Sequence, residues 1–254
     1  MKTYPDRLNV ETFTPATSVK QDGNSSYTVS TPKGDIKTSK VVYASNGFTP
    51  HLLPKLQSKI YPWRGTMSCQ DLGPDFPSHG ATRSWSFISE SKVDEELGAP
   101  NAGLYYLTQN GRSGLMFLGG ENENLDSILT SDDSQLNPHS AKKIGQVLPT
   151  LFKGAKQPEV KRIWSGIMGF TKDGLPLIGK LPALVTDREQ SDGEFIAAGF
   201  NGYGTGYCFL CGQAVGEMIL GKNADWLPEA FLVTKERFEG GLVSSPFHGH
   251  LLPS

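Results

Sequence analysis

Four glycines surround the junction between a predicted strand, residues 194–199, and a predicted helix, residues 205–220. They are Gly199, Gly202, Gly204 and Gly206. Without β-carbons the backbone can approach a ligand closely, and the free N–H groups and positive dipole of a helix start favour a phosphate or an enolate-like oxygen. The spacing differs from the dinucleotide fingerprint G-x-G-x-x-G, because Tyr207 stands at the third glycine position. A tight turn that needs glycine only for packing explains the pattern equally well.

A second candidate ligand site follows an apolar strand near the start of the chain. Strands are expected over residues 10–14, 26–31 and 36–44. The end of the third strand is apolar enough to be buried on both faces of a parallel sheet, and Asn46 and Gly47 follow it. In open α/β sheets, ligands bind beside small and polar residues just past the carboxyl end of such a strand.

The middle of the chain shows isolated strands divided by glycine, proline and polar loops. Strands are expected over residues 60–70, 82–89, 104–109, 115–118 and 160–168. Residues 110–114 are expected to form a hairpin turn, and residues 138–152 one amphipathic helix. The sequence therefore predicts an α/β fold of mixed α+β character, with an antiparallel sheet inserted between two α/β portions.

The composition argues against several classes of partner. A net charge of -2 over 254 residues gives no positive electrostatic field that would attract nucleic acid or an acidic membrane. We find no apolar leader and no apolar run that could span a bilayer, so a soluble cytoplasmic protein is expected. Residues 121–133 are acidic without metal-ligand spacing and are expected to be a solvated loop, and His248 and His250 lie in a Gly/Pro/Ser-rich tail. No metal site is predicted.

Four short motifs stand in a fixed order along the chain. They are VVYASNGFT at 41–49, PWRGTM at 62–67, WSGIMGFTKDGLPLIG at 164–179 and AGFNGYG at 198–204. Together they resemble the strand-end, P-x-R-G-x-M and C-terminal motifs of FAD-dependent amine and amino-acid oxidases. That family includes D-amino-acid oxidase, glycine and sarcosine oxidases and γ-glutamylputrescine oxidase. The resemblance covers roughly residues 10–238 and is specific, because four motifs in the right order make chance unlikely.

The resemblance implies a domain organisation and a cofactor. Residues 1–58 and 158–240 would form a partial FAD-binding domain of the glutathione-reductase type, residues 59–157 an antiparallel substrate-domain insert, and residues 241–254 a tail. The family's G-x-G-x-x-G unit, which binds the ADP half of FAD, is not found, so this βαβ unit is expected to be missing. FAD would be bound noncovalently, because Gly166 stands where sarcosine oxidases carry the cysteine that attaches the flavin.

The resemblance also implies a reaction. A hydride would pass from the carbon next to an amine nitrogen to flavin N5, giving an imine, and O2 would reoxidise the flavin to give H2O2. The substrate would be a small amine or amino acid. Met168 stands where amino-acid oxidases often carry an arginine for the substrate carboxylate, which favours an amine without an α-carboxylate. The alternative is a truncated, non-catalytic paralogue or fragment that keeps the fold without binding FAD.

The residues that the resemblance assigns to the site come from several motifs. The implied cofactor-binding residues are Asn46, Gly47, Gly174, Leu175, Gly199, Asn201, Gly202, Tyr203, Gly204 and Thr205. The implied substrate-pocket residues are Arg64, Tyr106 and Met168, although a carboxylate or backbone partner explains Arg64 better. Tyr203 and Tyr207 are candidates at the flavin edge, and packing explains them nearly as well. Asp173 is interpreted as a turn residue, because an uncharged amine needs no carboxylate to lose a hydride.

Overall fold

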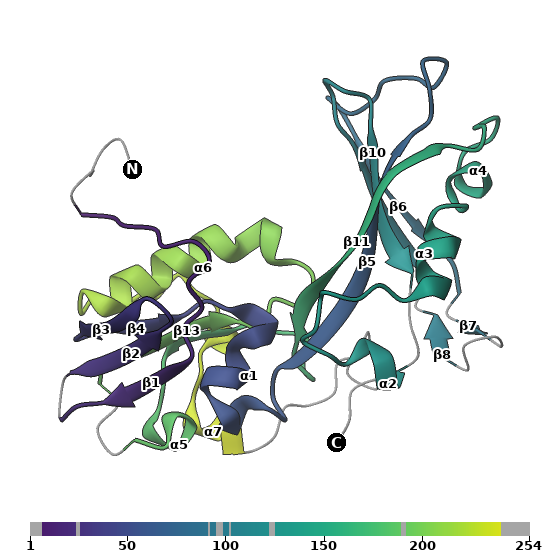
Figure 1. Ribbon diagram of the computed structural model, residues 1–254. Helices are drawn as coiled ribbons and strands as arrows, with labels where there is room; N and C mark the ends of the chain where they lie inside the picture. The colour runs from purple at the N-terminus through teal and green to yellow at the C-terminus, as the bar shows by residue number, and fades with distance from the viewer. Residues whose placement is uncertain are drawn as a thin grey trace. The chain divides into compact units, whose positions relative to one another are not determined.

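The structure, a computed structural model, divides the chain into two compact units (Figure 1). The residues described are 7–23, 26–90, 92–94, 99–101, 103–121, 125–188 and 192–239. The first unit contains the described residues of 7–60 and 171–239, and the second unit those of 61–170. The predicted boundaries at 58/59 and 157/158 therefore lie at 60/61 and 170/171, because the last strand of the insert runs from 159 to 170. The predicted tail, 241–254, falls outside the described residues.

A three-stranded sheet forms the centre of the first unit (Figure 1). Its order is β12 (Leu177–Lys180), β13 (Glu194–Ala198) and β4 (Val41–Tyr43). β13 is antiparallel to β12 and parallel to β4. Every residue of β13 is buried, so this middle strand is covered on both faces.

Different elements cover the two faces of β13. On one face, α6 (Gly204–Ile219) contributes Cys211 and Val215 to a core that includes Phe195. On the other face, an antiparallel sheet places Tyr27 in a core with Ile196. The strands of this second sheet are β1 (Ser18–Gln21), β2 (Tyr27–Thr31) and β3 (Gly34–Thr38). These contacts confirm the strands predicted over 26–31 and 194–199 and the helix predicted over 205–220.

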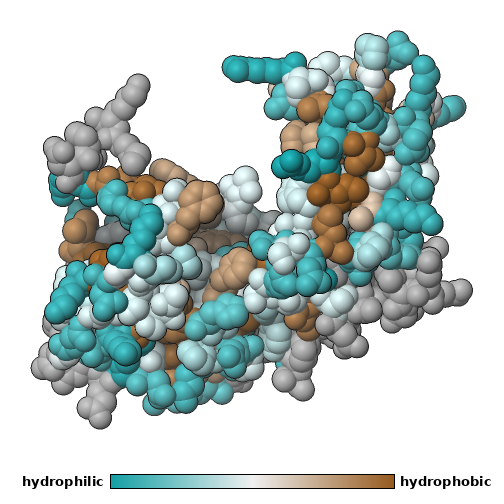
Figure 2. All heavy atoms as spheres, in the orientation of Figure 1, coloured by the Kyte–Doolittle hydropathy of each residue, from teal (hydrophilic) through white to brown (hydrophobic). Residues whose placement is uncertain are grey.

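The exposed side of α6 includes several apolar residues. Phe209 and Leu210, within the helix, and Leu220, just beyond its end, are exposed, and Figure 2 shows apolar residues at the molecular surface among hydrophilic ones. Polar residues share this exposed side, because Gln213 donates a hydrogen bond to Glu217 there (2.9 Å).

Two strand predictions for this unit are wrong. Residues 10–14 form no strand, and Phe13 is 97 % exposed with a φ of 53°, which is incompatible with an extended chain. Residues 36–44 form two strands, β3 and β4, in different sheets. The end of this segment is buried on one face only, because Tyr43 is buried whereas Val42 is 44 % exposed. Alternate side chains of a strand point to opposite faces, and the described residues cover the face of Tyr43.

A buried carboxylate joins the layers of the first unit. Glu194, at the start of β13, is fully buried, and its Oε1 accepts hydrogen bonds from the Tyr43 hydroxyl (2.5 Å) and Arg188 Nη1 (2.8 Å). Arg188 Nη2 also donates to the carbonyl oxygen of Val19 in β1 (2.6 Å). Burial, together with the adjacent carboxylate, raises the pKa of Tyr43, so its hydroxyl remains a donor. Charge-assisted hydrogen bonds thus connect β13 to β4 and to β1.

The second unit is built on a five-stranded sheet whose neighbouring strands are all antiparallel, as predicted. Its order is β11 (Glu159–Phe170), β5 (Tyr61–Asp71), β10 (Met116–Glu121), β9 (Leu104–Gln109) and β6 (Ser84–Ile88). The predicted hairpin turn is confirmed, because the Asn110 N–H bonds to the carbonyl oxygen of Leu115 (2.9 Å) and Gly114 has a φ of 75°. The mixed α/β class with an inserted antiparallel sheet is therefore confirmed.

One face of this sheet, which we call the helix-covered face, is buried beneath two short helices. The core there consists of Leu107, Met116, Leu118, Ile144 and Leu148. The helices are α3 (Pro138–Ile144) and α4 (Leu148–Leu151), so the single helix predicted over 138–152 is wrong. Pro149 has no amide hydrogen, and in a continuous helix its ring would clash with the carbonyl of Gly145.

The acidic segment 121–133 was expected to be a solvated loop, but part of it is helical. It contains α2 (Leu125–Ile128), and Ile128 is buried against Tyr61 and Trp63 of β5. The remaining short elements are α1 (Thr49–Leu52), α5 (Ala183–Thr186), α7 (Lys235–Glu239), β7 (Lys92–Asp94), β8 (Ala99–Asn101) and the 3₁₀ turns Asn46–Phe48, Pro54–Leu56 and Glu229–Phe231.

Replacing Arg188 by methionine is expected to lower the free energy of unfolding by about 3–5 kcal/mol, because the Glu194 carboxylate would stay buried without its cationic partner. Urea unfolding followed by circular dichroism measures this loss. The matched control is Lys180→Met, which removes an exposed pair with Asp192 (2.6 Å). The control should cost less than about 1 kcal/mol. Equal losses in the two variants would contradict a linking role for Arg188.

Candidate functional site

The side chain of Asn46 ties the end of β4 to the end of β13. Its Oδ1 accepts hydrogen bonds from the N–H groups of Gly199 (2.9 Å) and Phe200 (3.1 Å). Gly199 has a φ of 75°, and a β-carbon there would lie 2.7 Å from Thr171 Cγ2. Both the backbone conformation and packing therefore require glycine at this position. The structure gives Asn46 a positioning role at the start of the glycine-rich turn.

The side chain of Asn201 extends this network to the loop before β12. Asn201 is 4 % exposed, and its Oδ1 accepts a hydrogen bond from the N–H of Thr171 (2.8 Å). Its Nδ2 donates to the carbonyl oxygen of Gly199 (2.5 Å) and to Thr171 Oγ1 (3.1 Å). The Thr171 hydroxyl also contacts the carbonyl oxygen of Leu175 (2.8 Å). Because both ends of its amide are occupied, Asn201 can present only its backbone to a ligand.

α6 begins with an open N-terminus directly after this network. Tyr203 precedes the helix and provides no side-chain cap. Gly202 and Thr205 are exposed on either side of Gly204, the first helical residue. The first N–H groups of a helix have no partner one turn earlier in the helix. Here the Gly206 N–H donates to the carbonyl oxygen of Tyr203 (3.1 Å), which leaves the N–H groups of Gly204 and Thr205 to bind an electron-rich group.

The glycines of the turn are explained in different ways. At Gly204 a β-carbon would lie 3.2 Å from Phe200 Cβ, so packing favours glycine there. At Gly206 a β-carbon would meet nothing within 4 Å, and the φ angle is not positive. Packing therefore gives no reason for glycine at 206, which leaves close approach of a ligand as an explanation at this position.

The predicted site residues Gly174 and Leu175 lie in a tight turn before β12. Gly174 has a φ of 71°, and Asp173 Oδ1 accepts a hydrogen bond from the Leu175 N–H (3.1 Å). Asp173 Oδ2 accepts two more from Arg237 Nε (3.0 Å) and Nη2 (2.8 Å). The interpretation of Asp173 as a turn residue is confirmed, and the ion pair with Arg237 holds the turn.

The two tyrosines of the turn have different surroundings. The Tyr207 ring packs against Phe200 and Phe231, with ring centroids 5.9 Å apart in both cases. Burial raises the pKa of Tyr207, so it is protonated at neutral pH. Tyr203 is 55 % exposed. Packing therefore accounts for Tyr207, whereas the role of Tyr203 at a flavin edge stays a prediction.

In the second unit, Tyr106 and Met168 lie on the same face of the five-stranded sheet. Tyr106 pairs with Gly119, Gly119 with Met67, and Met67 with Trp164, and such directly opposite residues share a face. A β-carbon at Gly119 would lie 2.4 Å from both Met67 Sδ and the Tyr106 ring. Met168 follows Trp164 by four residues and so shares its face. We call this the aromatic face; it is opposite the helix-covered face.

Two paired glycines leave part of the aromatic face open. Gly65 and Gly166 are directly opposite each other in β5 and β11. A β-carbon at Gly65 would lie 3.1 Å from Met168 Cε, whereas one at Gly166 would meet nothing within 4 Å. The aromatic face is therefore open at Gly166, whereas the Met168 side chain covers Gly65.

Arg64 does not share the aromatic face. It stands between Trp63 and Gly65 in β5, so its side chain alternates to the other side. Arg64 is 8 % exposed, and it donates from Nη1 to the carbonyl oxygen of Asp132 (3.3 Å) and from Nη2 to that of Ser127 (3.1 Å). The backbone partner considered for Arg64 is thus confirmed, and the structure does not bring Arg64 to the face of Tyr106 and Met168.

The match to a family model decides the family. The model described as FAD dependent oxidoreductase, DAO, matches residues 7–218. The chain belongs to the DAO family. The resemblance predicted from its four motifs is therefore confirmed. Among the described residues of this DAO-family chain, no helix is long and apolar enough to cross a membrane, and no group of three His, Cys, Asp or Glu side chains could hold a metal ion.

Solved structures of DAO-type enzymes share this fold. L-proline dehydrogenase from P. horikoshii is 25 % identical, with a TM-score of 0.63, over 91 % of this chain and 55 % of its own. Glycine oxidase from Geobacillus kaustophilus is 20 % identical, with a TM-score of 0.62, over 87 % and 52 %. Amadoriase I from Aspergillus fumigatus is 11 % identical, with a TM-score of 0.62, over 85 % and 48 %. The chain thus spans about half the length of these structures. No curated protein matches it.

Sequence reasoning missed two residues of the first-unit network, Thr171 and Arg237. The N–H of Thr171 donates to the Asn201 side-chain oxygen, and the Thr171 hydroxyl accepts from the Asn201 side-chain nitrogen. Arg237 forms an ion pair with the carboxylate of Asp173. A signal for Thr171 existed, because it stands at a strand end three residues before Gly174 in a recognised motif. Arg237 gave none, since its partner lies 64 positions away in sequence.

Replacing Asn46 by alanine is expected to lower the free energy of unfolding by about 2 kcal/mol, because two backbone N–H groups lose their acceptor. Asn46→Asp keeps an oxygen acceptor and should retain most of the stability. Thermal unfolding followed by circular dichroism compares the two variants. Melting temperatures that are equally lowered would show that the hydrogen bonds of Asn46 are not what holds the turn.

Proposed function

We propose that this DAO-family chain forms part of a FAD-dependent oxidoreductase that oxidises the C–N bond of an amine or amino acid. When bound, FAD would take a hydride from the carbon next to the nitrogen, with O2 as the final acceptor and H2O2 as its product. Membership of the family over residues 7–218 supports the cofactor. The activities of two similar structures, a glycine oxidase and an L-proline dehydrogenase, support the substrate class.

The observation that carries the proposal is the open N-terminus of α6. Its free N–H groups and the positive end of its dipole would stabilise the negative charge that a flavin pyrimidine ring gains on reduction. The exposed backbone at Gly202 and the open space at Gly206 fit a flat ligand at close approach. Asn46 and Asn201 would act indirectly, by fixing the turn that leads into the helix. We propose noncovalent attachment, because Gly166 stands at the position where the resemblance to sarcosine oxidases would place the attaching cysteine.

The aromatic face of the second unit is the proposed substrate surface. Tyr106 and Met168, the two predicted pocket residues that share it, carry no charge at neutral pH, because burial raises the pKa of the Tyr106 phenol. The guanidinium of Arg64 is bonded to backbone carbonyls and alternates to the other face. A substrate carboxylate would therefore find no cation among these residues, which supports an amine without an α-carboxylate.

Replacing Gly206 by alanine is expected to weaken FAD binding about tenfold or more, a change of at least roughly 1.4 kcal/mol, because a β-carbon would keep the ligand off the helix N-terminus. The apoprotein should become more stable by up to about 1 kcal/mol, since alanine favours helices over glycine. Quenching of flavin fluorescence during titration gives the Kd, and thermal unfolding gives the stability.

Gly212→Ala is the matched control for this experiment. Gly212 lies in the same helix, and a β-carbon there would also meet nothing within 4 Å. This variant should gain the same stability and leave the Kd for FAD unchanged. The proposed cofactor site is wrong if both variants bind FAD equally well. A wild-type chain that binds no FAD would favour the non-catalytic alternative.

Replacing Met168 by arginine is expected to raise kcat/KM for an amino acid, relative to the amine without its carboxylate, by about tenfold or more, because a charge-assisted hydrogen bond to the carboxylate contributes roughly 1.5–3 kcal/mol. Met168→Gln, which is polar but neutral, is the control. The assay requires FAD-loaded protein and measures both substrates with each variant. An unchanged substrate ratio in Met168→Arg would place the substrate carboxylate away from this position.

A further inference from the structure

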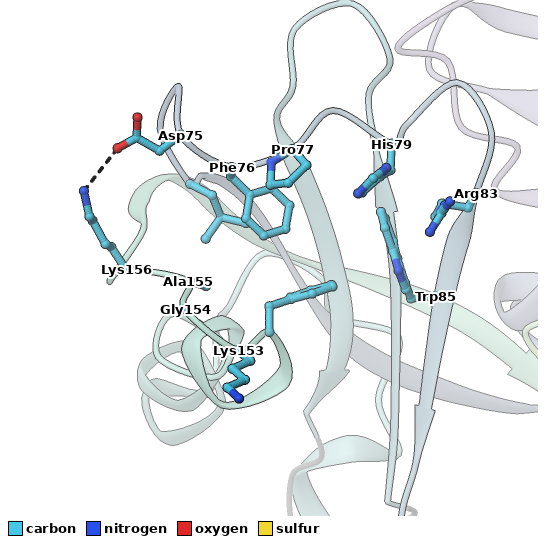
Figure 3. Close-up of a pocket in the computed structure, with 12 residues that line it drawn as sticks. Asp75, Phe76, Pro77, His79, Arg83, Trp85, Lys153, Gly154, Ala155 and Lys156 are labelled. Atoms are coloured by element: carbon cyan, nitrogen blue, oxygen red, sulfur yellow. Dashed lines mark hydrogen bonds and ion pairs between the residues drawn. The ribbon is translucent and has the colours of Figure 1, made fainter.

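A pocket in the second unit lies apart from the proposed substrate surface. Its volume is about 420 Å³, within the range of small-molecule sites. Figure 3 shows that its walls come from the connection between β5 and β6, from β6 itself and from the residues that follow α4. Trp85, in one wall, pairs with Leu107 on the helix-covered face, whereas Tyr106 is on the aromatic face. The pocket therefore opens on the opposite side of the sheet from Tyr106 and Met168.

Aromatic rings form the inner surface of this pocket. The ring of Phe152 meets Phe76, Trp85 and Phe87 edge to face, with centroids 5.3, 5.5 and 5.4 Å apart. The ring of His79 lies 6.3 Å from that of Trp85. Phe152 and Trp85 are only partly buried, so parts of these apolar rings face solvent in the pocket. Edge-to-face packing fixes their orientation and leaves a surface suited to a flat apolar ligand.

The rim of the pocket is positively charged. Arg83 and Lys153 are exposed, and within the described part of the chain neither side chain forms an ion pair or hydrogen bond. Figure 3 shows Arg83 and His79 beside Trp85, and Asp75 with Lys156 at the other end. The Asp75–Lys156 pair (3.2 Å) is largely exposed and so contributes little to stability. The pocket thus has an excess of positive charge in a chain whose net charge is -2.

We propose that this pocket binds a small aromatic carboxylate. The ring of the ligand would lie against Trp85 and Phe152, and its carboxylate would pair with the guanidinium of Arg83. A planar guanidinium binds a carboxylate through two parallel hydrogen bonds, and it has no competing partner here among the described residues. The aromatic wall accounts for the apolar body of the ligand, and the unpaired cations account for its negative charge. Neither feature is used by the proposed oxidation.

The test uses the full 254-residue chain without added FAD, so its outcome does not depend on the proposed oxidoreductase activity. Isothermal titration calorimetry measures binding of 2-naphthoate and of the neutral 2-naphthamide. The naphthoate should bind more tightly, and its Kd should rise with salt concentration because the cations are exposed. Arg83→Gln should raise the Kd of naphthoate by about fivefold or more and leave that of naphthamide nearly unchanged.

Matched variants separate this site from general attraction of an anion. Arg112→Gln removes an exposed arginine from the hairpin turn of the same unit, and it should leave both Kd values unchanged. Trp85→Leu should weaken both probes, with circular dichroism as the check on folding. The proposal is overturned if 2-naphthoate does not bind, if Arg83→Gln binds it as well as the wild type does, or if Arg112→Gln loses as much affinity as Arg83→Gln. The arginine variants alter exposed side chains, so they decide the matter even if Trp85→Leu fails to fold.

Discussion

Hydrogen bonds from two asparagine side chains hold the ends of separate strands at one place in the first unit. Asn46 accepts from the backbone after β13, and Asn201 bonds to Thr171 at the entrance to the β12 loop. These bonds are formed between segments that no ladder joins at this point, so the turn depends on side chains for its shape. α6 begins directly after this turn, and its open N-terminus is the main support for the proposed flavin site. The polar residues of the site therefore act mainly on the backbone, and the backbone is what would face the cofactor.

In the second unit, the two-residue period of strands decides which side chains can act together. Met168 and Tyr106 share one face, and Arg64 is turned to the other by a single position. The same alternation places Trp85 with the helix-covered core, near the aromatic pocket. One sheet thus offers an apolar, uncharged surface on one side and a cationic, aromatic pocket on the other. Membership of the DAO family supports a substrate role for the uncharged surface. The cationic pocket is inferred from this chain's own residues.

Local patterns allowed much of the fold to be predicted. The strand over 104–109 and the hairpin turn after it were placed correctly, because alternation and turn residues act within a few positions. The helix over 205–220 and the role of Asp173 were also predicted, since helical spacing and turn geometry are local as well. The break at Pro149 was a local signal too, and the helical pattern around it was wrongly given more weight.

What the sequence by itself determined was the family, the mixed α/β class with an inserted antiparallel sheet, and the presence of a glycine-rich turn before a helix. The tertiary structure alone decided which faces are buried, because burial depends on what packs against an element. It separated 36–44 into strands of two sheets and left Val42 exposed beside a buried Tyr43. It also paired Asp173 with Arg237, and it packed the ring of Trp85 against the ring of Phe152 in the aromatic pocket. No spacing in the sequence encodes such contacts, because they form between residues that folding brings together from distant positions.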